Sequence, residues 1–127
     1  MTSTYTNQAE APVTHLVAGE AALKLESAEA HVRQAAALLD GRLGERLSLE
    51  ERVKARAHIG YATGLAREIV DSLFSSSGAS AIQESVPIQR FQRDMQALAN
   101  HAIMNARPNI ELYGRVLCGL EPNSPLV

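Results

Sequence analysis

The sequence predicts an all-α fold, an antiparallel four-helix bundle, on three observations. Alanine and leucine are abundant, while aromatic residues make up 4% and tryptophan is absent, which suits closely packed helices better than β-sheets. Apolar residues recur at alternating intervals of three and four over two long segments, as on one face of an α-helix. Start and stop signals divide the chain into four helical segments. A length of 127 residues indicates one domain.

The chain begins with a polar, threonine-rich segment, so residues 1–12 are expected to form a flexible tail before a helical domain over residues 13–127. The first helix is expected over residues 15–39. Its apolar stripe consists of residues three or four apart: Ala18, Ala21, Leu25, Ala28, Val32, Ala35 and Leu39. Gly41 and Gly44 then interrupt the pattern.

A second long helix is predicted over residues 49–75. Ser48 and Glu51 have the spacing of a capping box, in which each side chain accepts a hydrogen bond from the other residue's amide. Gly60 and Gly64 lie inside this helix, where each glycine costs roughly 1 kcal/mol relative to alanine. Such a cost indicates that a neighbouring helix or ligand approaches the backbone closely there.

Pro87 suits the first turn of a third helix. The apolar stripe of this helix is Ile88, Phe91, Met95, Leu98 and Ala102. Pro108 is expected to end it, because proline breaks a helix interior. A fourth, shorter helix is then expected over residues 109–118, with Gly119 as its cap.

Three polar residues of the third segment are candidates for chemistry. Arg90 and Asp94 are four apart and Asp94 and His101 are seven apart, which places all three on nearly one helical face, opposite to the apolar stripe. An aspartate orients a histidine or balances an arginine, and histidine exchanges protons near neutral pH. The alternative is a solvated face with an ordinary ion pair.

A turn of small residues separates the second and third helices. It contains Ser75, Ser77, Gly78 and Ser80, whose hydroxyls and backbone amides are able to bind a phosphate group. The alternative is a helix cap in which Gly78 adopts a left-handed conformation. The turn is not a P-loop, because no Gly-Lys-Ser/Thr follows.

The order of these motifs carries a resemblance to a known family. Ser-Gly-Ala-Ser-Ala, Ile-Gln-Arg, Arg-Asp, His-Ala and Tyr-Gly-Arg occur in that order between residues 77 and 115. The chain from about residue 14 to residue 127 resembles the C-terminal helical domain of acyl-CoA-dehydrogenase-like flavin proteins, in the branch of two-component flavin-dependent monooxygenases.

The resemblance implies roles for these residues. His101 matches the histidine beside the reactive edge of the flavin, which helps to deprotonate a phenolic substrate, with Asp94 as its neighbour. Arg93 matches an arginine near the flavin phosphate or the neighbouring subunit, and Arg90 is assigned to the same phosphate. The turn at residues 75–80 matches a segment that contacts flavin phosphate, so the implied cofactor is FMN or FAD.

The chain also departs from the family pattern. Asn109-Ile-Glu-Leu-Tyr-Gly114 stands where acyl-CoA dehydrogenases have Tyr-Glu-Gly, which disfavours acyl-CoA oxidation. Gln92 and Gln96 stand where the monooxygenases commonly have an aromatic residue and a histidine. The family's two other domains do not fit in this length. A flavin-protein chain or a second copy of this chain is therefore expected to complete the site.

Three functions remain open. The first is a domain of a flavin-dependent oxidoreductase or monooxygenase system acting on a small molecule, with His101 as acid/base. The second is a cofactor-free, cyclase-like enzyme on a natural-product substrate, and the third is a non-catalytic oligomerisation or partner module. A second helix about 40 Å long favours a homo-oligomer in all three.

The remaining signals exclude other classes of function. A net charge of -2 gives no general attraction to nucleic acid or membrane. The histidines His15, His31 and His58 are scattered without partners at ligand spacing, so no metal site is expected. Cys118 lies among apolar residues and is expected to be buried and inert. The N-terminal residues lack export features, which leads to an expected cytoplasmic location.

Overall fold

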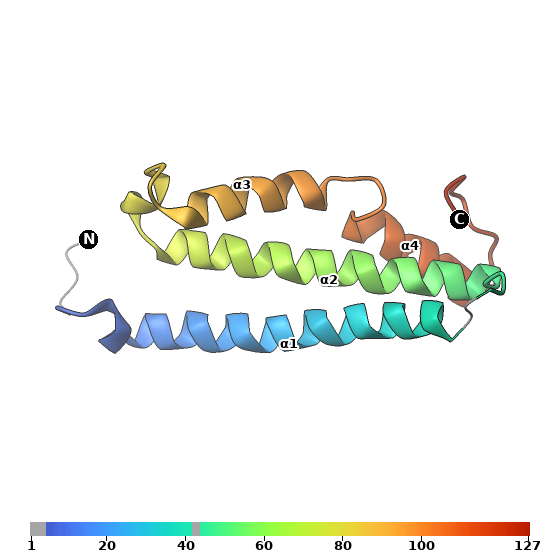
Figure 1. The fold of residues 1–127 in the computed structure, drawn as a ribbon, viewed down its shortest axis with the longest axis horizontal. Helices are drawn as coiled ribbons and strands as arrows, with labels where there is room; N and C mark the ends of the chain where they lie inside the picture. Colours follow the sequence, from blue (N-terminus) through green and yellow to red (C-terminus); the bar gives the residue numbers. More distant parts are fainter. Residues whose placement is uncertain (1–4, 42–43) are drawn as a thin grey trace.

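The computed structural model describes residues 5–41 and 44–127, and within these residues all regular elements are helical (Figure 1). The predicted all-α class is therefore confirmed. The four α-helices are α1 (Pro12–Asp40), α2 (Leu49–Ser76), α3 (Pro87–Ala99) and α4 (Ala106–Leu117). Two short 3-10 helices precede α1 and α3, namely η1 (Gln8–Glu10) and η2 (Ala79–Ile82). No helix in the described part of the chain is long and apolar enough to cross a membrane.

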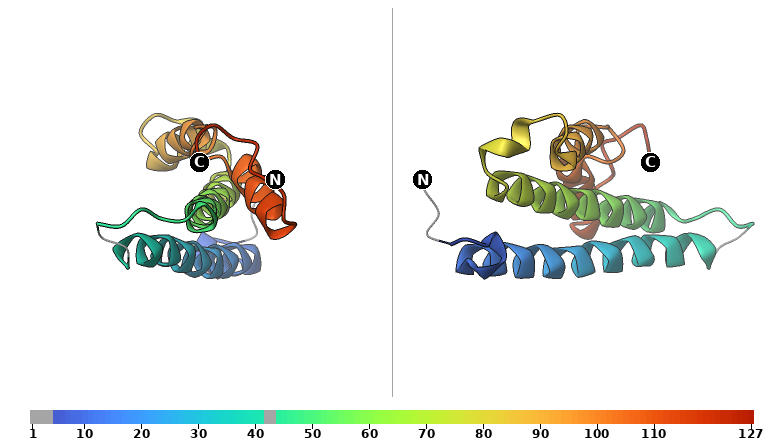
Figure 2. Two further views of the ribbon diagram at one scale, coloured as in Figure 1. Left: turned by 90° about the vertical axis from the view of Figure 1, so that its right-hand side faces the viewer. Right: turned by 60° about the vertical axis from the view of Figure 1, so that its left-hand side comes forward.

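Helix α2 lies at the centre of the molecule and makes the principal contacts with each of the other three helices. Figure 1 shows α1 along one side of α2, and α3 and α4 one after the other along the opposite side. The end-on view in Figure 2 places α2 between α1 and α3. The bundle is therefore elongated (Figure 1).

The start of α2 is fixed by the predicted capping box. The Ser48 hydroxyl accepts a hydrogen bond from the Glu51 amide at 3.2 Å, and the Glu51 carboxylate accepts one from the Ser48 amide at 2.9 Å. Both bonds satisfy amides that a helix N-terminus leaves unpaired. The two long helices thus agree closely with the segments predicted from the sequence.

The buried core is built mainly from small residues. Alanines are buried along α1 and α2, and the large apolar side chains that are fully buried are Val53 on α2 and Leu112 on α4. Many larger apolar side chains remain exposed: Val13, Leu16, Leu23, Leu25, Val32 and Leu39 on α1, and Phe91 and Leu98 on α3. Extended exposed apolar surface marks contact sites for another protein or domain.

Gly60 and Gly64 lie where α2 meets α4. A Cβ added at Gly60 would lie 2.9 Å from the Asn109 Cβ, and one added at Gly64 would lie 3.2 Å from the Ala106 Cβ. Real Cβ atoms avoid such distances, so both glycines permit a close approach of the two helices. The close approach predicted from the two glycines is confirmed, and α4 is the neighbour.

The predicted boundary between the third and fourth helices is wrong. Helix α3 ends at Ala99, and α4 already begins at Ala106, so Pro108 lies in the first turn of α4. Proline is tolerated there because the amides of the first turn need no helical partner. The Asn105 side chain caps this turn by accepting a hydrogen bond from the Arg107 amide at 3.2 Å.

Part of the segment expected to be a tail has regular structure. Asn7 caps η1 by accepting a hydrogen bond from the Ala9 amide at 3.0 Å. The Gln8 side chain donates to the Ser76 carbonyl at the end of α2, at 3.2 Å. Residues 5–12 therefore contact the helical domain, whereas residues 1–4 of the predicted tail lie outside the described residues.

Candidate functional site

His101 lies in the turn between α3 and α4, and not on the helical face predicted for it, because α3 ends before it. Its backbone carbonyl accepts hydrogen bonds from the amides of Met104 and Asn105, both at 2.9 Å. Its exposed ring accepts a hydrogen bond at Nδ1 from the Ile103 amide at 3.3 Å. With Nδ1 as acceptor, a neutral ring carries its proton on Nε2.

The side chain of Asn109 holds this turn in place. Its Nδ2 donates to the Ile103 carbonyl at 2.7 Å and to the Asn105 carbonyl at 2.8 Å. Its Oδ1 accepts from Arg56 Nε on α2 at 3.1 Å, and the residue has no exposed surface. Gly60 provides the space that Asn109 occupies. No pattern in the sequence indicated this role, because it depends on how α2 and α4 meet.

Asp94 does not contact His101 and instead pairs with its own neighbour. Its Oδ1 accepts hydrogen bonds from Arg93 Nε and Nη2, both at 3.2 Å. Both side chains are well exposed, at 74% for Arg93 and 59% for Asp94. The predicted common face of Arg90, Asp94 and His101 is therefore wrong for His101, since helical periodicity stops at Ala99.

The serine turn follows the end of α2. Ser75 Oγ donates to the Asp71 carbonyl at 2.8 Å, and Ser77 Oγ donates to the Leu73 carbonyl at 2.7 Å. Gly78 has a φ of 73° and a ψ of -172°, a conformation that favours glycine but is not left-handed helical, and the cap residue of α2 is Ser77, so the predicted glycine cap is wrong. Ser80 Oγ lies 3.4 Å from the Ser77 carbonyl. These hydroxyl protons are directed at backbone carbonyls, so the donors left for an anion are chiefly backbone amides.

Arg90 and Arg93 come together at the start of α3. They line a hollow of about 540 Å³ with Phe74, which lies near the end of α2 and next to the serine turn. Glu84 lines the same hollow and adds one negative charge to it. The two predicted arginines therefore share this hollow with the residue that precedes the predicted turn, while Ser75, Ser77, Gly78 and Ser80 themselves do not line it. His101 lies beyond the other end of α3, which is about 20 Å long.

The two glutamines that depart from the family pattern connect α3 to α2. Gln96 Nε2 donates to Asp71 Oδ1 at 2.9 Å, and Gln92 Nε2 lies 3.4 Å from the same oxygen. Arg67 pairs with the other carboxylate oxygen of Asp71 at 3.7 Å. The two glutamines thus hold α3 against α2. The sequence pattern did not single out Asp71, although it accepts these hydrogen bonds.

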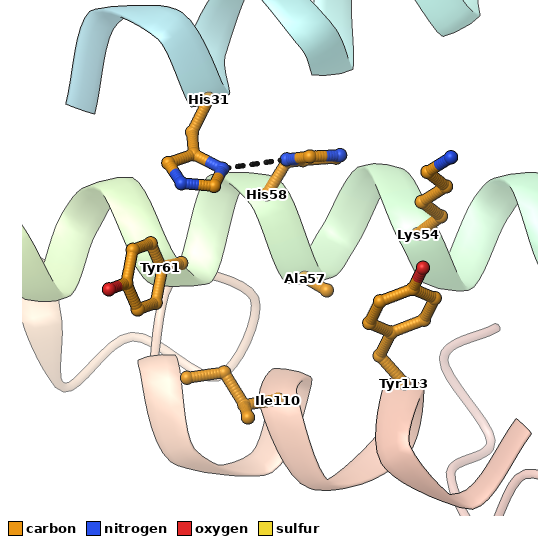
Figure 3. A pocket seen from close by; sticks show the side chains of 7 residues that line it. All are labelled: His31, Lys54, Ala57, His58, Tyr61, Ile110 and Tyr113. Atoms are coloured by element: carbon orange, nitrogen blue, oxygen red, sulfur yellow. Dashed lines mark hydrogen bonds between the residues drawn. The ribbon is translucent and has the colours of Figure 1, made fainter. Parts of the chain in front are cut away.

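Two histidines that the sequence left scattered meet across α1 and α2. Figure 3 shows the rings of His31 and His58 facing each other, with their Nδ1 atoms 2.8 Å apart. The edge of His31 also packs against Tyr61, with ring centroids 4.7 Å apart. A signal for this pair existed, because His31 is ten residues before Gly41 and His58 is ten residues after Ser48. An antiparallel hairpin places such positions opposite each other.

The histidine pair lies at a small pocket of about 200 Å³. Lys54, Ala57, Ile110 and Tyr113 complete its lining, as Figure 3 shows. Burial lowers the pKa of His58, and the nearby positive charges of His31 and Lys54 lower it further. In this hydrogen bond one Nδ1 donates and the other accepts. Only one of the two rings can therefore carry a hydrogen on Nδ1.

Two other expectations concern cysteine and metal. Cys118 is exposed, so its predicted burial is wrong; it follows the last residue of α4, where the chain leaves the bundle. Within residues 5–41 and 44–127, no three His, Cys, Asp or Glu side chains are grouped as metal ligands.

Comparison with known proteins identifies relatives of this fold. Residues 1–106 match the family described as acyl-CoA dehydrogenase, C-terminal domain. The oxygenase subunit HsaA of a flavin-dependent monooxygenase from Rhodococcus jostii is 38% identical over 84 residues, which are 66% of this chain and 22% of that protein. The oxygenase component of an FADH2-dependent resorcinol hydroxylase from Rhizobium is 31% identical over 120 residues, 90% of this chain and 29% of that protein.

Solved structures agree with this assignment. XiaF from Streptomyces, in complex with FADH2 and glycerol, superposes with a TM-score of 0.89 at 35% identity, covering 97% of this chain and 32% of that one. The HsaA monooxygenase from Mycobacterium tuberculosis superposes with a TM-score of 0.76 at 32% identity, covering 96% of this chain and 32% of that one. The chain thus spans a third or less of the length of these relatives. It belongs to the acyl-CoA dehydrogenase C-terminal domain family, and the relatives it is similar to are oxygenase components of flavin-dependent monooxygenases and hydroxylases.

Proposed function

We propose that this chain acts in a flavin-dependent oxidoreductase or monooxygenase system on a small-molecule substrate, with His101 as its acid/base residue. The observation that carries this proposal is the turn between α3 and α4, where His101 is exposed and its ring is oriented by the backbone. Relatives that share the fold are oxygenase components of flavin-dependent hydroxylases and monooxygenases.

The geometry of His101 suits proton transfer at Nε2. The hydrogen bond from the Ile103 amide to Nδ1 is long, at 3.3 Å, so little is lost when the ring changes tautomer. Nε2 then serves as donor in one tautomer and as acceptor in the other, which general acid–base catalysis requires. Asp94, expected to assist His101, is bonded to Arg93. The catalytic part of the proposal therefore rests on His101, and Asp94 orients Arg93.

The phosphate of an FMN or FAD cofactor is assigned to the hollow at the start of α3. Arg90 and Arg93 bring two guanidinium groups to this hollow, and guanidinium matches phosphate in charge and geometry. Backbone amides of the turn at residues 75–80 add donors, with Gly78 shaping the turn and the hydroxyls of Ser75, Ser77 and Ser80 bracing it. The bound flavin would supply the redox chemistry that side chains lack.

A second chain is part of the proposal. Helix α3 separates His101 from Arg90 and Arg93, so this chain alone forms only part of a flavin site. We assign the rest of that site to a flavin-protein chain or to another copy of this chain. The exposed apolar side chains of α1 and α3 support such a contact. They also favour the alternative of a non-catalytic partner module, in which the assembly forms and His101 has no role.

The test begins with binding. We expect FMN or FAD, oxidised or reduced, to bind saturably, as followed by flavin absorbance and fluorescence. Arg93→Met should weaken binding by about tenfold, because it removes a charged hydrogen-bond donor. Arg33→Met is the matched control, since this arginine is exposed on α1 and paired with Glu29. Absence of saturable binding in the assembled system would refute the cofactor assignment.

The role of His101 is tested separately in the complete oxygenase assembly. His101→Asn should reduce kcat by roughly 100-fold or more while flavin binding is kept, as expected for loss of a general acid–base residue. An unchanged kcat would remove His101 from the mechanism and favour the partner-module alternative.

A further inference from the structure

A second large cavity lies on the side of α2 that faces α1, away from the arginine hollow. Its volume is about 540 Å³, and it is formed by the second half of α1, the first half of α2, the His101 turn and the C-terminal segment. These parts meet toward the right-hand side of Figure 1. The lining is mainly aliphatic, with contributions from Val32, Leu39, Leu47, Ile59, Ile103 and Met104. Its volume is in the range of small-molecule sites.

Two arginines of α2 also line this cavity, and they differ in their partners. Arg56 is satisfied, because its Nε donates to Asn109 Oδ1 at 3.1 Å and its Nη1 donates to the Leu126 carbonyl at 2.7 Å. Arg52 is only half-buried, but its Nε is buried and has no hydrogen-bond partner among the described residues. A buried donor without an acceptor costs free energy, and a charged one costs more.

These two properties define the chemistry of an occupant. Aliphatic walls favour a hydrophobic body, and an unpaired guanidinium favours one negative charge with planar acceptor oxygens. A neutral molecule would leave Arg52 Nε unpaired, and the charged side chains of the lining are both arginines, which disfavours a cation. We propose that this cavity binds a hydrophobic monocarboxylate, whose carboxylate pairs with Arg52 and whose apolar body lies along α1 and the His101 turn.

This site is separate from the hollow assigned to the flavin phosphate, because none of its lining residues belongs to the hollow of Arg90 and Arg93. It has a second consequence within the fold. Ile103 and Met104 belong to the turn that carries His101, so an occupied cavity supports that turn from the α1 side. Amide exchange of residues 100–105 should therefore slow when the ligand is bound.

The experiment uses decanoate as the probe, with 1-decanol and decylamine as comparison ligands of the same chain length. Isothermal titration calorimetry of the full chain should show saturable binding of decanoate, with affinity at least about tenfold higher than for decanol, because a charged hydrogen bond is added. Decylamine should bind most weakly. Equal affinity for decanoate and decanol, or no saturable decanoate binding, would overturn the proposal.

Two variants locate the site. Arg52→Met keeps most of the aliphatic part of the side chain and removes its charge. Decanoate should therefore bind about tenfold more weakly, while the affinity for decanol should not change. Ala36→Phe fills the cavity from an exposed position on α1 and should block both ligands. Arg33→Met, which removes an exposed charge on α1, is the control and should bind decanoate normally. Normal decanoate binding by folded Ala36→Phe would overturn the proposed location even if Arg52→Met failed to fold.

Discussion

The His101 turn and the His31–His58 pair are two histidine environments of opposite construction. His101 is exposed and is held by backbone groups of its own turn, with Asn109 as the outside support. His31 and His58 belong to different helices and hold each other at 2.8 Å. The first arrangement leaves a ring nitrogen free for chemistry, and the second uses ring nitrogens for packing. Which histidine is a candidate for catalysis therefore depends on how exposed its ring is and on which groups its ring nitrogens bind.

The largest effect is expected for Asn109→Ala, which removes the support of the His101 turn. The carbonyls of Ile103 and Asn105 and the side chain of Arg56 each lose a buried hydrogen-bond partner. The free energy of unfolding should therefore fall by about 3 kcal/mol. Urea denaturation measures the loss, and amide exchange should accelerate at residues 100–105 but not around His31. Asn123→Ala is the control, because Asn123 is exposed and donates to Glu111 at 3.3 Å. An equal loss in both variants would contradict the support role.

Gly60→Ala should disturb the same turn from the α2 side. The added Cβ would meet Asn109 at 2.9 Å, and overpacking of this kind costs about 2 kcal/mol. Gly19→Ala, on α1, meets no atom within 4 Å and should stabilise the protein by up to about 1 kcal/mol through helix propensity. Thermal denaturation of both variants checks the prediction. A stabilised Gly60→Ala variant would show that α2 and α4 separate easily.

A pH titration should distinguish the histidine pair from the turn. The pKa of His58 lies below its usual value of 6.5, first through burial and then through the charges of His31 and Lys54. The unfolded chain therefore binds a proton more readily than the folded chain. The contribution of this group to stability is complete above about pH 6.5 and is lost as the pH falls through the lowered pKa.

The measurement is the urea midpoint between pH 7.5 and about pH 5, followed in the parent chain and in His58→Asn. Loss of the titrating ring should flatten the decrease in stability, while Asn123→Ala, which removes an exposed side chain without a titrating group, should leave it as it is. The same slope in the parent and in His58→Asn would assign the effect to other groups.

The smallest effect is expected for Asp94→Asn, at the exposed pair on α3. Exposed ion pairs contribute little, so the free energy of unfolding should change by no more than about 0.5 kcal/mol. Denaturation at low and high salt checks this, because screening should remove what remains of the effect. A loss above about 1 kcal/mol would indicate that Asp94 has a partner in an assembly.

Local signals in the sequence determined the long helices. The apolar stripe predicted α1, the Ser48–Glu51 capping box predicted the start of α2, and the glycine pair predicted a close neighbour. These signals succeed because each depends on hydrogen bonds or steric limits within a few residues of the chain. The motif order also placed the chain in its family.

Only the tertiary structure decided the ends of α3 and α4 and the partners of the histidines. By its sequence, Pro108 can either end the third helix or lie in the first turn of the fourth. It lies in the first turn of α4, where its neighbour Asn109 is buried against Gly60. His31 and His58 are 27 residues apart, so their contact depends on the register between α1 and α2. Contacts between helices follow from packing geometry, which no short segment of sequence contains.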